Sequence, residues 1–591
     1  MNTWWTTGQP APPPTWRDIL ALGGEQPFHG LLVLTMLAAV VVLAMSLSVL
    51  LLRAATEKQR RPWKTTLSLW LLALVAVYFL ATAAYFTLRF VGRWTAGDMA
   101  TLALATKLLH DTGTISTAAP GPIYPHGVTY QALSLFLVEI CAIPLEALQT
   151  HILPFVAVLV TLVGFVAYRA LVGNNSTALL AMFLICLQPD FLFVVFRGSH
   201  EKATWSLVLL LYFILAKSVS TNKSTGYLAR LVVLFYLAAL ALIATNQFFA
   251  SSFIAAMSAV FAGGSLLLAA RQKTGAQSAR MAGQHIRRLL YITLACSGLQ
   301  YIFIAYLYPP ANHSLRALRT LSDRLAALLL NFEPQFDPYA YVPATWQHPL
   351  IYPALSAFSY VILIGSLIVW IAGLPQLFRK DLQQQHLPRV LLWFLYPGFA
   401  LQVILSTIVD QTGWVGGNLQ VRLFTPTMLV AAPLMAEGLA RLARTARLAR
   451  PQRARLLAAA ALCGWFSLTA LLKMSNEPIL GNQWMFFTQA EQQAGAWASR
   501  HITEGSLWVG PDVRLHSAIS FHFRQPTDTS IRFVASEPSP DVQLFLLSDI
   551  ERQRYRRQGI EPPSFDDDFL IYDNGPVQIY RRPTRASYPA D

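Results

Sequence analysis

Apolar runs of about eighteen or more residues recur along this chain, and they limit the folds that are open to it. A run of that length is what an α-helix needs to cross a bilayer, whose hydrocarbon core is about 30 Å thick. Hydrophobic residues make up 54% of the 591 residues and charged residues only 13%, so a soluble core cannot bury the apolar surface. The sequence therefore predicts a polytopic α-helical membrane protein. We place about twelve transmembrane helices near residues 30–52, 66–88, 151–171, 176–196, 203–217, 227–246, 250–270, 288–307, 351–377, 389–409, 421–440 and 456–473.

The net charge of +15 is distributed as in a membrane protein, and it does not indicate a nucleic-acid partner. The basic residues cluster in short segments between apolar runs, where they set orientation and meet anionic lipid headgroups. These segments are residues 53–64, 271–288, 379–389 and 441–455. All of them face the cytoplasm only if the stretch from Tyr130 to Thr150 does not span, so we expect a helix in the outer interface there. This topology places both termini on the non-cytoplasmic side, and we expect the protein in the plasma (inner) membrane.

Composition divides the chain into three parts. We expect a non-cytoplasmic N-terminal segment at residues 1–29, a transmembrane domain at residues 30–473 and a non-cytoplasmic C-terminal domain at residues 474–591. In the last part the charge rises and short alternating runs appear, namely SLWVG, VQLFLL, DFLIY and VQIYR, which is typical of strands. Asn574-Gly575 between the last two runs indicates a hairpin, because this pair tolerates positive φ. With a helical pattern from Thr488 to His501, these runs predict a small α/β domain.

Two long loops, residues 89–150 and 308–350, face the same side as the C-terminal domain in this topology. The first loop opens with Asp98, which falls where the second predicted span leaves the membrane. A partly amphipathic run follows, and then Tyr124-Pro125-His126-Gly127 turns the chain. An aspartate before an apolar run is also typical of a helix N-cap, and a capping acid can still face a cleft.

A short turn after the fourth predicted span concentrates ionisable side chains. Arg197, His200, Glu201 and Lys202 stand within six residues of one another there. Charges at the membrane edge are costly, which favours a functional role over a solvated turn with interfacial anchors. The two basic side chains suit a phosphate or pyrophosphate, which arginine binds bidentately. An acid such as Asp98 or Glu201 suits the orientation or deprotonation of an acceptor hydroxyl.

The order of these pieces resembles the GT-C class of integral-membrane glycosyltransferases, which includes oligosaccharyltransferase catalytic subunits and protein mannosyltransferases. In that class an external loop begins with an acid near the membrane, continues through interfacial helices and a Tyr-Pro turn, and returns to the bilayer. The resemblance implies transfer of a sugar from a polyprenyl-phosphate or polyprenyl-pyrophosphate donor to a glycan, lipid or protein acceptor on the non-cytoplasmic face. It implies catalytic roles for Asp98 and Glu201.

The resemblance also implies that Arg197, Lys202 and Arg422 bind the donor phosphate. Arg422 stands at a membrane edge where the class often has an arginine, and an ordinary snorkelling arginine is the alternative. The candidates for an acceptor or cleft-lining role are His200, Tyr124, His126, Asn246 and Trp346. For the aromatic residues of the second long loop, such as Trp346, the alternative is an interfacial aromatic belt. For Asn246 the alternative is a buried structural amide.

Related enzymes carry a short acidic motif at the turn, and this chain has His200-Glu201 there. The sequence is therefore compatible with a divalent metal but does not require one, and the ligands would come from Asp98, His200 and Glu201. Two other functions stay open. A transporter or flippase of lipid-linked saccharides predicts paired half-repeats and mid-bilayer charges, which the sequence does not show. A non-catalytic scaffold with an external binding domain predicts that substitutions at Asp98 and Arg197 are harmless.

Overall fold

The computed structural model describes residues 27–56, 64–90, 97–113, 126–220, 225–271, 290–308, 321, 323–330, 351–379, 387–412, 419–445, 452–474, 487–502, 505–509, 519, 521, 531–534, 542–549, 551–552, 555 and 561–583. Eleven of its helices are long and apolar enough to cross a membrane, and a bent helix pair raises the number to twelve if it counts as one span. The prediction of a polytopic helical protein with about twelve spans is confirmed. The long helices are α2 (Pro27–Thr56), α3 (Lys64–Phe90), α8 (Leu159–Val172, in the span Leu145–Val172), α11 (Glu201–Ser220), α12 (Thr225–Thr245), α13 (Gln247–Arg271), the span Leu290–Leu307, α16 (Ile351–Arg379), α17 (Leu387–Asp410), α18 (Leu419–Thr445) and α19 (Gln452–Met474).

The bent pair replaces the continuous helix that we expected over residues 176–196. It consists of α9 (Asn175–Cys186) and α10 (Pro189–Phe196), which meet at 74°. Proline has no backbone N–H and disfavours helical geometry in the residue before it. Gln188 is accordingly extended, with φ −87° and ψ 115°, and its side chain caps α10 by accepting from the Phe191 amide. The bend brings α10 and the start of α11 together at one end of the helical bundle.

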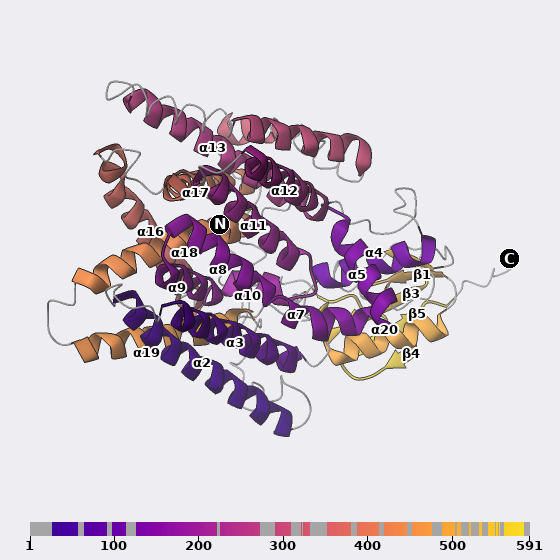
Figure 1. Cartoon of the computed structure of the whole chain (residues 1–591). Coiled ribbons are helices and arrows are strands. Elements are labelled where there is room, and N and C mark those ends of the chain that lie inside the picture. The colour runs from indigo at the N-terminus through magenta and orange to yellow at the C-terminus, as the bar shows by residue number, and fades with distance from the viewer. Residues whose placement is uncertain are drawn as a thin grey trace, which may run out of the picture.

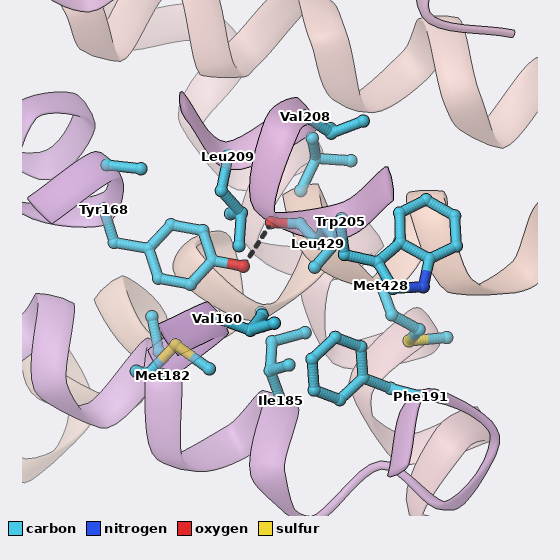
Figure 2. Packing of buried hydrophobic residues seen from close by; sticks show 14 of the residues in the cluster. Val160, Tyr168, Met182, Ile185, Phe191, Trp205, Val208, Leu209, Met428 and Leu429 are labelled. Atoms are coloured by element: carbon cyan, nitrogen blue, oxygen red, sulfur yellow. Dashed lines mark hydrogen bonds between the residues drawn. The ribbon is translucent and has the colours of Figure 1, made fainter. Parts of the chain in front are cut away.

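The bundle is packed around α18, in which 78% of the most apolar stretch of the span Arg422–Ala443 is buried. Figure 2 shows the core where α8, α9, α11 and α18 meet. There the Tyr168 hydroxyl donates to the Leu429 carbonyl at 2.9 Å. That carbonyl lies four residues before Pro433, which has no N–H to offer it, so the tyrosine supplies the hydrogen bond that the helix cannot make. Trp205 from α11 packs in the same core, which anchors the first turns of α11.

The first long loop contains α4 (Gly97–Thr112) and α5 (Thr129–Cys141). We expected one interfacial helix from Tyr130 to Thr150, but α5 ends at Ala142, which adopts a left-handed conformation with φ 50°. Pro144 follows, and the chain then continues through α6 (Leu145–Ala147), the π-helical turn η1 (Leu148–Ile152) and α7 (Leu153–Val156) into α8. Residues from Leu145 onward therefore belong to the next span rather than to the interfacial segment.

The C-terminal part forms a five-stranded mixed sheet in the order β2-β1-β3-β5-β4, flanked by α20 (Gln489–His501). The strands are β1 (Gly505–Trp508), β2 (Ile531–Val534), β3 (Leu544–Ser548), β4 (Phe569–Asp573) and β5 (Val577–Arg581). The expected hairpin is confirmed, since β4 pairs antiparallel with β5 and Gly575 has φ 84°. Helix α20 begins with a capping box in which Thr488 and Glu491 bond each other's backbone amides. Strand β2, which pairs in parallel with β1 at the sheet edge, was not predicted.

Helix α4 completes the hydrophobic core of this sheet domain. Met99, Ala100 and Ala103 are almost fully buried in one cluster with residues of α20 and of strands β1, β3 and β5. The Lys107 ammonium also donates to the Phe521 carbonyl at 2.8 Å. Figure 1 shows the sheet, α20, α4 and α5 together at one end of the helical bundle. The first long loop and the C-terminal domain therefore lie on the same side of the spans.

Candidate active site

The connection between α10 and α11 holds a buried ion pair. Arg197 ends α10 in an extended conformation, with φ −61° and ψ 155°, and Glu201 begins α11 one helical turn later. The Arg197 guanidinium lies 2.5 Å from Glu201 Oε1, and the two side chains are 10% and 7% exposed. Each charge is thus neutralised by the other in a place where an isolated charge is costly.

Lys202 closes the same connection from the other direction. Its ammonium donates to the carbonyls of Arg197 and Ser199, at 2.8 Å each. It also lies 5.6 Å from the centre of the Tyr130 ring of α5, within the range of a cation–π contact. We call residues 197–202 the charged turn. It contains two basic side chains and one carboxylate, together with His200.

His200 links the charged turn to the junction between α12 and α13. Its Nε2 accepts from the side-chain amide of Asn246, which sets the proton of a neutral ring on Nδ1. Nδ1 is 3.9 Å from Glu201 Oε2. Asn246 is buried, and its Oδ1 accepts from the Phe249 amide at 3.2 Å, so it also caps α13. The structural role of this amide and its place beside the charged turn are therefore compatible.

The Tyr-Pro-His-Gly turn ends by pairing with the same junction. The Gln247 amide donates to the His126 carbonyl, and the Val128 amide donates to the Ala244 carbonyl, at 2.8 Å each. Gly127 lies between these bonds, and a Cβ there would stand 2.4 Å from the Thr245 carbonyl oxygen. Glycine is required because the two backbones touch. His126 thus reaches the end of the bundle where Asn246 and His200 lie.

The start of α4 packs directly against the charged turn. A Cβ on Gly198 would come within 2.9 Å of the Met99 side chain. Asp98 precedes Met99 and lies in the first turn of α4, which begins at Gly97, rather than before it. Only the backbone of Asp98 is described. Its main chain and the charged turn are consequently neighbours on one side of the spans.

Arg422 lies in the first turn of α18, at the same end of the bundle. The preceding loop is closed by Asp410, whose carboxylate accepts from the Leu419 and Gln420 amides at 2.8 Å each. Leu419 packs in one apolar cluster with Phe248 of α13, and the Phe248 ring lies 6.4 Å from the His126 ring. Arg422 itself is partly exposed. No direct contact between Arg422 and the charged turn is among those described.

The second long loop also reaches this end. Its helical residues 323–330 contact the loop after α17, where Arg324 donates to the Thr412 carbonyl at 3.2 Å. Trp346 in this loop and Tyr124 in the first loop lie outside the described residues. The structure therefore brings together the charged turn, Asn246, His126 and the start of α4, and it leaves these two aromatic candidates without a described position.

Two of the basic segments meet at the other end of the bundle. Glu437 near the end of α18 accepts from Arg389 at the start of α17, at 2.6 Å, and from Arg441 at 3.3 Å. Arg389 and Asp410 lie at opposite ends of α17. Arg389 and Arg441, which are described residues of two basic segments, are thus on the side away from the charged turn.

The charged turn offers few donor atoms for a metal. Glu201 Oε2 is one donor, and His200 Nδ1, 3.9 Å away, becomes a second only if it loses the proton that the bond to Asn246 places there. Among the side chains that the structure describes, no group of three or more histidine, cysteine, aspartate or glutamate residues is arranged to hold a metal. A third donor would have to come from Asp98, whose side chain is outside the described part, so these residues provide an incomplete site.

Gln149 is a neighbour of the charged turn that sequence reasoning missed. It lies in η1, is fully buried, and its Cβ is 3.1 Å from the position of a Cβ on Gly198. A single polar residue at the start of an apolar run carries no distinctive pattern. Only the fold places this amide against a turn that comes fifty residues later in the chain.

No protein-family model matches the sequence, and no curated protein matches it. Solved structures do match. The oligosaccharyltransferase of Archaeoglobus fulgidus in the apo form has a TM-score of 0.52 at 13% identity, covering 90% of this chain and 76% of that one. The oligosaccharyltransferase AglB of the same organism, in complex with an inhibitory peptide and a dolichol-phosphate, has a TM-score of 0.50 at 12% identity, covering 89% and 75%.

ArnT from Cupriavidus metallidurans bound to undecaprenyl phosphate has a TM-score of 0.42 at 11% identity, covering 85% of this chain and 97% of that one. The two oligosaccharyltransferase matches cover 89% and 90% of this chain. This chain is therefore built on the fold of the GT-C class of integral-membrane glycosyltransferases.

Proposed function

We propose that the protein is a membrane glycosyltransferase that takes a sugar from a polyprenyl-phosphate or polyprenyl-pyrophosphate donor. The acceptor is a glycan, a lipid or a protein, and the reaction takes place on the non-cytoplasmic face of the plasma membrane. The proposal rests on the shared fold and on one observation of this chain. The contact between Met99 and Gly198 places the residue after Asp98 against the charged turn, with the C-terminal domain over the same helix.

In this proposal Asp98 accepts the proton of the acceptor hydroxyl. The acceptor oxygen then bonds to the anomeric carbon of the donor sugar, while the bond from that carbon to the phosphate oxygen breaks. The lipid phosphate leaves with the electron pair. A positioned carboxylate contributes about 10²–10⁴-fold to such a step.

The charged turn supplies the electrostatic part of the mechanism. A leaving phosphate gains negative charge, and the N–H donors of Arg197 and Lys202 stabilise it where water is excluded. The phosphate competes with the Arg197 and Ser199 carbonyls for the Lys202 ammonium, because both are hydrogen-bond acceptors. Glu201 holds the Arg197 guanidinium in place through their 2.5 Å contact. Arg422 binds the lipid phosphate at the membrane edge, and His200, His126 and Asn246 shape the acceptor side, together with Tyr124 and Trp346.

A transfer assay tests this function. The purified full-length chain is reconstituted in lipid nanodiscs and incubated with a panel of radiolabelled polyprenyl-phosphate hexoses and pentoses, with and without EDTA. We expect label to pass from at least one donor to a membrane extract or peptide acceptor. In sealed vesicles that contain the same protein, movement of intact labelled donor across the bilayer without transfer would instead identify the transporter. Absence of both, with binding of a partner by the C-terminal domain, would identify the scaffold. Loss of transfer in EDTA would establish a dependence on a divalent metal, for which Asp98, His200 and Glu201 are the candidate ligands.

A further inference from the structure

Gln149 is buried without any hydrogen bond for its side-chain amide. The residue has an exposed fraction of 0%, and neither Nε2 nor Oε1 has a partner among the described residues. Buried side-chain polar groups are nearly always paired, because they lose their bonds to water and gain nothing in return. The amide is therefore a group whose partner has to be explained.

The two other polar side chains of this turn, Thr150 and His151, are hydrogen-bonded, so the unpaired amide is specific to Gln149. The next residue, Thr150, donates from its hydroxyl to the Glu146 carbonyl at 2.7 Å. Leu148 and Leu153 anchor the segment in an apolar cluster with Tyr130. Gln149 lies in the π-helical turn η1, and such single π turns inside α-helical segments are frequent at functional sites.

The amide also lies next to the proposed centre. The Gln149 Cβ and the Met99 side chain both approach Gly198, at 3.1 and 2.9 Å from the position that its Cβ would take. Glu201 Oε2, also in the charged turn, is buried and without a hydrogen bond among the described residues. The side chain of Gln149 and the charged turn therefore meet at Gly198, beside Met99 of α4.

The chemistry of an amide restricts what would satisfy it. Nε2 donates and Oε1 accepts, so a complete partner must both accept and donate. An ionised phosphate oxygen only accepts and would leave Oε1 unpaired. A sugar hydroxyl does both.

We propose that Gln149 hydrogen-bonds a hydroxyl of the donor sugar, and thereby helps to choose which sugar is transferred. This inference rests on the proposed function. Gln149 is fully buried in this structure, so the sugar reaches its amide only after side chains packed around it move.

The test is Gln149→Met, which keeps the length of the side chain and removes both polar atoms. In the absence of substrate the variant is relieved of an unpaired group, so its Tm is equal to or higher than that of the wild type. For the donor that the wild type uses best in the hexose and pentose panel, KM rises at least about tenfold, because a site that binds a hydroxyl loses that bond. The inhibition constant of sugar-free polyprenyl phosphate stays unchanged.

Tyr212→Phe is the matched control. The Tyr212 hydroxyl on α11 is also buried and without a hydrogen bond among the described residues. Tyr212→Phe also removes a buried polar group that has no partner among the described residues, but this group lies deeper in the bundle. We therefore expect KM for the donor to stay at the wild-type value.

The outcomes separate the two proposals. Transfer by the wild type with an unchanged donor KM in Gln149→Met overturns the role of Gln149 and leaves the function standing. A parallel rise in the inhibition constant of sugar-free polyprenyl phosphate overturns the assignment to the sugar. A wild type that transfers no label refutes the proposed function, and the role of Gln149 falls with it.

Discussion

The substitution Gly127→Ala tests how the first long loop is attached to the bundle. A Cβ at this position would stand 2.4 and 2.5 Å from the Thr245 and Ala244 carbonyl oxygens. Both are backbone atoms at a helix junction, so they cannot turn away as a flexible side chain does. Among the described glycines, those with positive φ are at other positions, so the requirement here is for space rather than for a left-handed conformation.

The magnitude follows from what has to move. Relieving the overlap separates the two backbones, which breaks the Gln247–His126 and Val128–Ala244 hydrogen bonds. Two such bonds together with the overpacking give a loss of about 2–6 kcal/mol in the free energy of unfolding. Alanine also restricts the unfolded chain, which returns only about 0.4–1 kcal/mol.

The assay is thermal unfolding of the purified protein in detergent, with size-exclusion chromatography used to measure the folded fraction after each heating step. We expect Gly127→Ala to unfold well below the wild type. Gly298→Ala is the control, because this glycine lies in the span Leu290–Leu307 and a Cβ on it meets nothing within 4 Å. Its Tm should be unchanged or slightly higher, since alanine favours a helix over glycine by about 0.8–1.0 kcal/mol. If Gly127→Ala matched the control, the backbone contact described for this turn would be wrong.

Two further predictions concern charged contacts. Arg197→Met alone, or Glu201→Met alone, should lower the free energy of unfolding by about 3–5 kcal/mol, because each leaves a buried charge unpaired. The double variant should unfold at a higher temperature than either single variant. A double variant that is no more stable than the less stable single variant would contradict the buried pair. His110 lies 3.1 Å from both Asp111 and Glu139, and the hydrogen bond to Asp111, reinforced by Glu139, raises the pKa of His110. A histidine whose pKa is raised in the folded state stabilises that state fully at pH values below its pKa in the unfolded chain. The stabilisation is lost as the pH rises through its pKa in the folded state. The Tm of the wild type should therefore exceed that of His110→Gln at about pH 5.5, and the two should converge at about pH 8.5. The difference at the lower pH is small, because the His110 side chain is 56% exposed. A difference in Tm that does not change with pH would exclude this titration.

Features that depend on neighbouring residues could be predicted from the sequence. The spans follow from the length of apolar runs, and the β4–β5 hairpin follows from Asn574-Gly575. The helix after Thr488 follows from its helical pattern, and the structure adds a capping box at its start. The order of acid, helical run, turn and charged turn likewise indicated the fold, because external loops of the GT-C class keep that order.

Features that depend on distant contacts could not be predicted. Pro189 marks the bend between α9 and α10, but hydropathy is continuous across it and favoured one span. Strand β2 has four residues and pairs only at the sheet edge, so its short run carried too little pattern. The pairing of Arg197 with Glu201 and the isolation of Gln149 follow from burial, which residue types do not report. Arg197 and Lys202 were predicted to bind a phosphate, and the sequence did not indicate that both side chains also bond within the turn itself.

The central claim is that an acid at the start of α4 activates the acceptor beside the charged turn. The direct measurement compares the transfer rate of the wild type, Asp98→Asn and Asp111→Asn in nanodiscs with the same labelled donor. Asp111 lies near the other end of α4 and serves as the control. We predict that Asp98→Asn elutes and unfolds like the wild type but transfers at least about 10²-fold more slowly, whereas Asp111→Asn keeps the wild-type rate. A folded Asp98→Asn variant with full transfer activity would contradict the account.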